Sequence, residues 1–79
     1  MQEQIQRDFD EFSQSLEDMS DVPRLIDRLN SLIARVWKAA GFVGKGETRE
    51  AQGRVCIAIR DHDAILARVA LADLRSLVR

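Results

Sequence analysis

The fold is decided by residues 47–79, which read ETREAQGRVCIAIRDHDAILARVALADLRSLVR. The stretch contains no proline, and its one glycine, Gly53, lies near its start. When the positions are sorted by heptad, a single row is clearly polar: Glu47, Arg54, Asp61, Arg68 and Arg75. The other rows are largely apolar, and a helix that is apolar nearly all round is typically a buried one. We therefore expect one long helix with more apolar surface than the rest of the chain can cover.

A short strand is the alternative for part of this stretch. Residues 54–60, RVCIAIR, are rich in β-branched side chains and are bounded by Gly53 and Asp61. Periodicity alone does not separate such a run from a buried helix segment. A lone strand has no mate in the chain, whereas the helical pattern continues smoothly to Leu77. Helix is therefore the favoured prediction.

Two shorter helices are expected before residue 47. The first covers residues 3–19, where the apolar residues are spaced four, three, four and three positions apart: Ile5, Phe9, Phe12, Leu16 and Met19. Such a narrow seam is typical of a helix that packs on a neighbour. The second covers residues 22–40, with Asp21 as N-cap, Pro23 in the first turn and Gly41 as C-cap. Residues 41–46 form the loop that follows, and we expect Phe42 and Val43 to pack against the end of the bundle.

The length allows one small domain, residues 1–79. A chain of this size buries only about 60% of the surface of its unfolded form, and Cys56 is the one cysteine, so no intrachain disulfide can form. Extra support then usually comes from oligomerisation or very good helix packing. We expect an all-α fold of two shorter helices and one long C-terminal helix, completed by oligomerisation. The single cysteine, the lack of a signal-peptide pattern and the short apolar runs favour a cytoplasmic protein and no membrane span.

The surplus apolar surface predicts a non-enzymatic protein–protein interaction module. A small regulator, inhibitor or chaperone-like adaptor of bacterial or phage type, acting as a homodimer or bound to another protein, fits the size and composition. We expect the interface to comprise Val55, Ile59, His62, Asp63, Leu66, Val69 and Ala70.

His62 and Asp63 are polar residues on this mostly apolar surface. Burial of either without a partner would cost about 1–3 kcal/mol, so we expect a hydrogen-bonded or ion-paired couple that fixes helix register. If two long helices crossed antiparallel at their centres, the two pairs would meet on the two-fold axis and could respond to pH or hold a metal. No two ligands are spaced as in His-Glu-x-x-His, however, so neither metal nor cofactor is expected.

The charges are unevenly distributed along the chain and suggest two alternative functions. Residues 1–21 carry a net charge of −6 and residues 22–45 a net charge of +4. A basic ridge on the second helix comprises Arg24, Arg28, Arg35 and Lys38. Such a ridge could bind a nucleic-acid backbone in a helical-hairpin dimer, although the acidic first helix could neutralise it. A small helical-dimer enzyme with a pocket between its helices is the other alternative; no catalytic residue is assigned.

Overall fold

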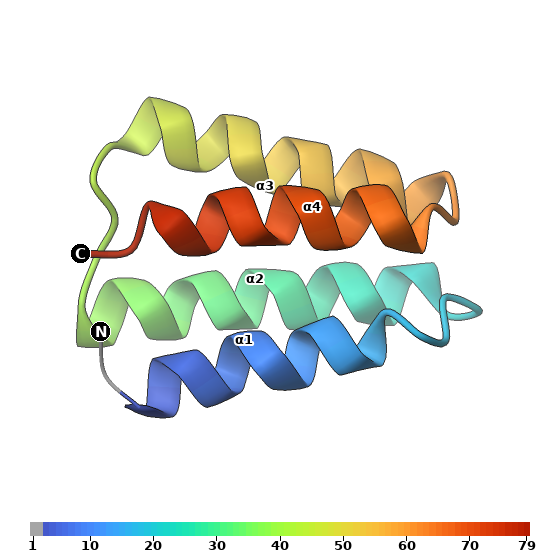
Figure 1. The fold of residues 1–79 in the computed structure, drawn as a ribbon, viewed down its shortest axis with the longest axis horizontal. Coiled ribbons are helices and arrows are strands. Elements are labelled where there is room, and N and C mark those ends of the chain that lie inside the picture. Colours follow the sequence, from blue (N-terminus) through green and yellow to red (C-terminus); the bar gives the residue numbers. More distant parts are fainter. Residues whose placement is uncertain (1–2) are drawn as a thin grey trace.

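The computed structural model describes residues 3–79, which form four α-helices. These are α1 (Glu3–Ser15), α2 (Val22–Ala39), α3 (Lys45–Arg60) and α4 (Ala64–Ser76). The helices run side by side in alternating directions (Figure 1), and each packs on the next while α1 packs on α4. The molecule is therefore an up-and-down four-helix bundle. The all-α prediction is confirmed, but the predicted number of helices is wrong.

The difference lies at Asp61, His62 and Asp63, where the predicted long helix is interrupted. His62 adopts a φ of 57°, the left-handed conformation that commonly ends a helix. Its N–H donates to the Ile59 carbonyl at 3.1 Å, and the Asp63 N–H donates to the Ala58 carbonyl at 2.9 Å. This is the Schellman pair of hydrogen bonds that closes α3. The strand alternative for residues 54–60 is also wrong, because they lie within α3.

Because α3 and α4 fold back on each other, many of the apolar side chains of residues 47–79 become buried within the chain itself. The residues of the hairpin that become buried are Ala51, Val55, Ala58, Ile59, Ala67, Ala70, Leu71 and Leu74. They join the side chains of α1 and α2 in one hydrophobic core. An antiparallel crossing of two long helices at His62 requires a continuous helix, and this turn removes it.

The first half of the chain folds close to expectation. All five residues of the α1 seam are buried, although the helix ends at Ser15 and Leu16 and Met19 belong to the connection that follows. The Asp21 carboxylate accepts a hydrogen bond from the Arg24 N–H at 3.2 Å, which caps α2 as predicted.

The loop after α2 is fixed by the C-terminus of the chain. Phe42 is buried and packs edge-on against Trp37, with the ring centroids 5.1 Å apart. The Val43 N–H donates to the Leu77 carbonyl at 2.8 Å, and Phe42 pairs with Val78 in an antiparallel bridge. The Val43 side chain is 59% exposed, so its predicted packing on the bundle end is wrong.

Candidate protein-interaction face

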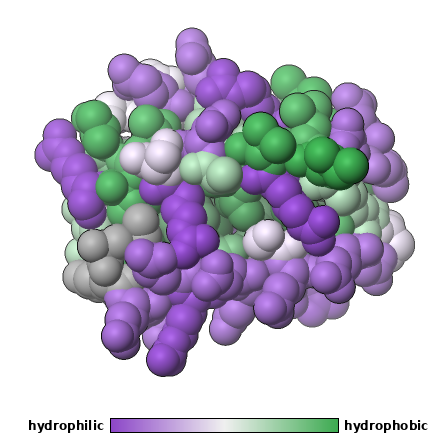
Figure 2. All heavy atoms as spheres, in the orientation of Figure 1, coloured by the Kyte–Doolittle hydropathy of each residue, from purple (hydrophilic) through white to green (hydrophobic). Residues whose placement is uncertain are grey.

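The outward side of α4 carries large apolar side chains that the core does not use. Ile65 is 78% exposed, Val69 55% and Leu66 45%. The buried side of the same helix is formed by Ala67, Ala70, Leu71 and Leu74. We call Ile65, Leu66 and Val69 the outer face of α4. Hydrophobic residues gather over α3 and α4 in the view of Figure 2, whereas the surface over α1 is mostly hydrophilic.

Ile57 adds a further apolar side chain to the same hairpin. It lies in the last turn of α3, close to the α3–α4 turn, and is 57% exposed. Neither Ile57 nor Ile65 is among the interface residues expected from the sequence. In one continuous helix both lie in rows beside the polar row, whereas the expected interface lay on the far side of the helix.

The structure divides the seven expected interface residues into three groups. Val55, Ile59 and Ala70 are buried in the core of this chain. Leu66 and Val69 are exposed on the outer face of α4. His62 and Asp63 are exposed in the α3–α4 turn.

Both polar residues of the turn have local structural roles. The Asp63 carboxylate accepts a hydrogen bond from the Leu66 N–H at 3.0 Å and so caps α4. The His62 Nδ1 lies 3.2 Å from the Arg60 carbonyl oxygen. Within residues 3–79, no three His, Cys, Asp or Glu side chains are grouped so as to hold a metal ion.

Two charged residues flank the outer face of α4 on opposite sides. Arg68 lies on the α1 side, where it lines a small groove with Phe9, Asp10 and Ser13. Asp73 lies on the opposite flank, toward α3, because it is five positions from Arg68, about 140° around the helix, and α3 is the other neighbour of α4. Both residues are exposed, and in the part of the chain that the structure describes neither forms an ion pair.

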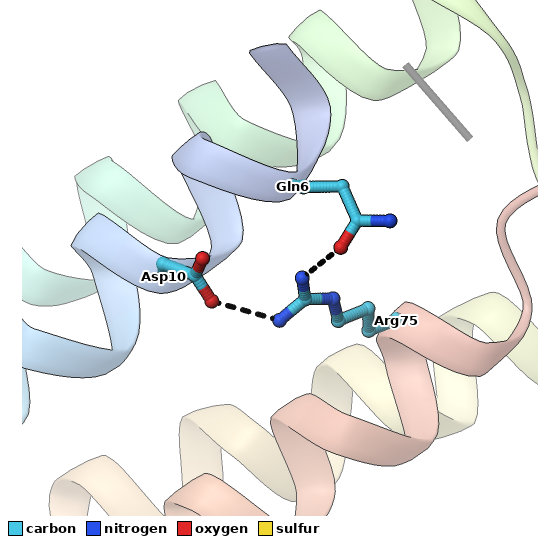
Figure 3. A network of polar contacts seen from close by, with 3 residues as sticks. All are labelled: Gln6, Asp10 and Arg75. Carbon is cyan, nitrogen blue, oxygen red and sulfur yellow. Dashed lines mark hydrogen bonds and ion pairs between the residues drawn. The ribbon is translucent and has the colours of Figure 1, made fainter. Parts of the chain in front are cut away.

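Arg75 links α4 to α1 beside this face. The Arg75 guanidinium contacts Asp10 at 2.9 Å and also donates to the Gln6 side-chain oxygen (Figure 3). Its Cζ atom lies 5.7 Å from the centre of the Phe9 ring, within cation–π range. The orientation of α4, and therefore of its outer face, is fixed by these contacts together with the core.

The predicted basic ridge lies along a groove between α1 and α2. Arg24, Arg28 and Arg35 line this groove, which has a volume of about 390 Å³, and Lys38 lies beyond it. The groove also contains three acidic residues, Asp8, Glu11 and Asp27. Arg35 Nε lies 3.3 Å from Asp8 Oδ2. The three positive charges are therefore balanced by three negative charges, which opposes attraction of a phosphate backbone.

Cys56 lies partly buried on α3 and packs against the core. Burial raises the pKa of its thiol, although the nearby Arg60 lowers it. A raised pKa reduces the fraction of reactive thiolate at neutral pH, so the residue acts as a small apolar packing group.

Comparison with protein families, curated proteins and solved structures finds no significant match to this chain. Among residues 3–79, no helix is long and apolar enough to cross a membrane.

Proposed function

We propose that this chain is a small non-enzymatic protein–protein interaction module that docks through the outer face of α4. The proposal rests on one observation: Ile65, Leu66 and Val69 are exposed side by side on one helix. Large apolar side chains that are gathered in one patch typically mark an interaction surface, whereas scattered ones do not. The role is that of a regulator, inhibitor or chaperone-like adaptor that binds a second copy of itself or another protein.

Two further observations support a docking role for this face. The bundle already buries nineteen hydrophobic residues in its own core, so the exposed side chains are not a core left open. The face lies on a helix that is held on both sides, by α3 and by the Arg75 contacts to α1. A surface on a rigid helix loses little conformational entropy when it binds.

The test replaces the apolar character of the face and leaves the fold unchanged. In the variant Ile65→Lys/Val69→Lys, we expect self-association and any partner recovered from the native cell to be lost. The control is Val43→Lys. Val43 is 59% exposed, close to the 55% of Val69, but it lies in the α2–α3 loop at the opposite end of the bundle from the α3–α4 turn. Circular dichroism should show the same helix content for all three proteins.

Two results would contradict the proposal. One is a double-lysine variant that retains every association of the wild type. The other is a wild-type chain that stays monomeric at high concentration and recovers no partner.

The nucleic-acid alternative has less support, because the arginine groove contains an equal number of acidic side chains. Changing Arg24, Arg28 and Arg35 together to Gln tests it. Salt-sensitive retention of RNA or DNA that this triple variant loses would favour the alternative. The enzyme alternative rests on the same groove, which combines arginines with carboxylates.

A further inference from the structure

The exposed residues of α4 follow the spacing of a coiled-coil seam. Ile65, Val69 and Ala72 are four and three positions apart, and all three are exposed. In heptad notation they occupy d, a and d positions, which place them in one line along the outward side of the helix. The following Ser76, the last residue of α4, continues the same line at an a position.

The two flanking charges occupy the positions that pair across a parallel coiled coil. With Val69 at position a, Arg68 is a g residue and Asp73 is the e residue of the next heptad. In a parallel pair, a g residue of one helix faces the e residue five positions later on the other. Arg68 and Asp73 have opposite charges and lack an intrachain ion pair in the described region, so each can serve as the other's partner between chains.

We propose that the occupant of the outer face of α4 is a second copy of this chain, paired in parallel along α4. Ile65, Val69 and Ala72 form the seam of this dimer, and two symmetry-related Arg68–Asp73 ion pairs flank it. This inference rests on the proposed function and specifies the partner. The seam is one heptad long, so the complex is a weak and reversible one at the low end of interface size.

Charge favours the parallel arrangement over the antiparallel one. A two-fold axis that pairs two helices antiparallel brings like flanks together, so the Arg68 side of one copy would face the Arg68 side of the other. The parallel axis instead brings the α1 side of one copy toward the α3 side of the other. Helix α1 carries four acidic residues and one basic residue, whereas α3 carries four basic and two acidic ones. Opposite charges therefore face each other only in the parallel dimer.

The experiment exchanges the two charges and measures self-association by sedimentation equilibrium. Five samples are compared: wild type, Arg68→Asp, Asp73→Arg, an equimolar mixture of these two variants, and the double variant. We use concentrations from about 10 µM to about 1 mM, which bracket weak association, and about 20 mM salt, at which exposed charges interact strongly. Thermal unfolding of each variant checks that the bundle is intact.

The parallel dimer predicts a specific pattern of loss and recovery. Each single variant places like charges at both ion pairs and should weaken self-association roughly tenfold. The mixture should recover wild-type affinity, because a heterodimer of the two single variants has two opposite-charge pairs. The double variant should recover it as well.

Three outcomes would overturn the inference. A mixture no stronger than the single variants would exclude the Arg68–Asp73 pairing. Single variants that associate as strongly as the wild type, with a mixture that associates more tightly than the wild type, would indicate the antiparallel arrangement, in which Arg68 faces Arg68 and Asp73 faces Asp73. A monomeric wild type whose native-cell partner is still lost in Ile65→Lys/Val69→Lys would assign the face to a different protein and leave the proposed function standing.

Discussion

The Asp63 carboxylate accepts a hydrogen bond from the Leu66 N–H at 3.0 Å, directly after His62 with its φ of 57°. The cap satisfies a backbone donor in the first turn of α4 and stabilises that helix. The left-handed conformation of His62 opposes this gain, because its Cβ approaches the following carbonyl at a cost of about 1–2 kcal/mol. In the turn between α3 and α4, the stabilising cap at Asp63 and the conformational cost at His62 therefore oppose each other.

Substitutions at these two positions should change stability in opposite directions. Asp63→Ala should lower the free energy of unfolding by about 1 kcal/mol through loss of the cap. His62→Gly should raise it by about 0.5 kcal/mol, because glycine adopts a positive φ without steric cost. Urea denaturation measures both changes. Arg60→Gly, within the last turn of α3, is the control and should destabilise.

The sign of the His62→Gly change distinguishes the hairpin from a continuous helix. In the middle of a helix, glycine would lower stability by about 0.5–1 kcal/mol relative to most residues. A destabilised His62→Gly variant would therefore contradict a turn at this position.

Ile59 and Val69 should respond very differently to truncation, although both are interface residues in the sequence prediction. Ile59 is fully buried, so Ile59→Ala should cost about 3 kcal/mol, a large part of the stability of a small domain. Val69 is 55% exposed, so Val69→Ala should change the free energy of unfolding by less than about 0.5 kcal/mol. Chemical denaturation compares the two variants. Equal losses would mean that the bundle does not divide core from surface as described.

Arg75 should stabilise the contact between α1 and α4. Arg75→Ala removes the ion pair with Asp10 and the contact with the Phe9 ring, with an expected cost of about 1–1.5 kcal/mol. Arg75→Lys should cost less, because a lysine keeps the positive charge. A smaller cost should remain, because lysine lacks the planar guanidinium that makes both contacts. The control is Arg68→Ala, which removes an arginine of the same helix that forms no ion pair within residues 3–79.

Salt provides a second measurement of the same contact. At about 1 M salt the Debye length falls to about 3 Å, so the stability difference between wild type and Arg75→Ala should shrink but not vanish. A difference that is independent of salt would assign the whole effect to packing on Phe9.

Cys56 should react slowly with alkylating reagents at neutral pH. Burial raises the pKa of its thiol, and only the thiolate is nucleophilic. The rate of iodoacetamide modification should therefore rise with a midpoint above pH 9.0, the ordinary value for the thiol. Unfolding in urea is the control and should shift the midpoint down. A native midpoint well below pH 9.0 would show that Arg60 outweighs burial.

The elements with complete local signals could be predicted from the sequence. The α2 helix has an N-cap at Asp21, a proline in its first turn and a glycine two residues after its last residue, and the structure places its ends within one residue of expectation, with Ala40 instead of Gly41 as the C-cap. The α1 seam is equally regular, and its residues are buried. Here local propensity and packing agree, which is why the pattern suffices.

The turn at residues 61–63 could not be predicted with the same ease. Its left-handed position is filled by His62 instead of glycine, and the apolar rows continue on both sides without interruption. Asp63 is a good N-cap residue, so a signal for a new helix was present but was indistinguishable from a polar residue within a long one. The break depends on α4 packing back on α3, which is a tertiary effect.

The same turn explains how far the candidate face was predictable. Leu66 and Val69 were expected at an interface and are exposed, whereas Val55, Ile59 and Ala70 turn inward because α3 and α4 face each other. The ridge of Arg24, Arg28 and Arg35 kept its spacing along the uninterrupted α2. The approach of Asp8 to Arg35 depends on how α1 packs, so its effect on the charge of the groove followed only from the structure.

The distance between the two ends of residues 47–79 is the sharpest test of the α3–α4 hairpin, which determines which side of α4 is free. Spin labels at positions 50 and 76, in a Cys56→Ser background, allow this distance to be measured by pulsed electron paramagnetic resonance. The hairpin brings both labels to the same end of a molecule whose longest dimension is 30 Å, so we expect a distance well below that value. A distance of about 39 Å, the length of 26 residues of continuous helix, would contradict it.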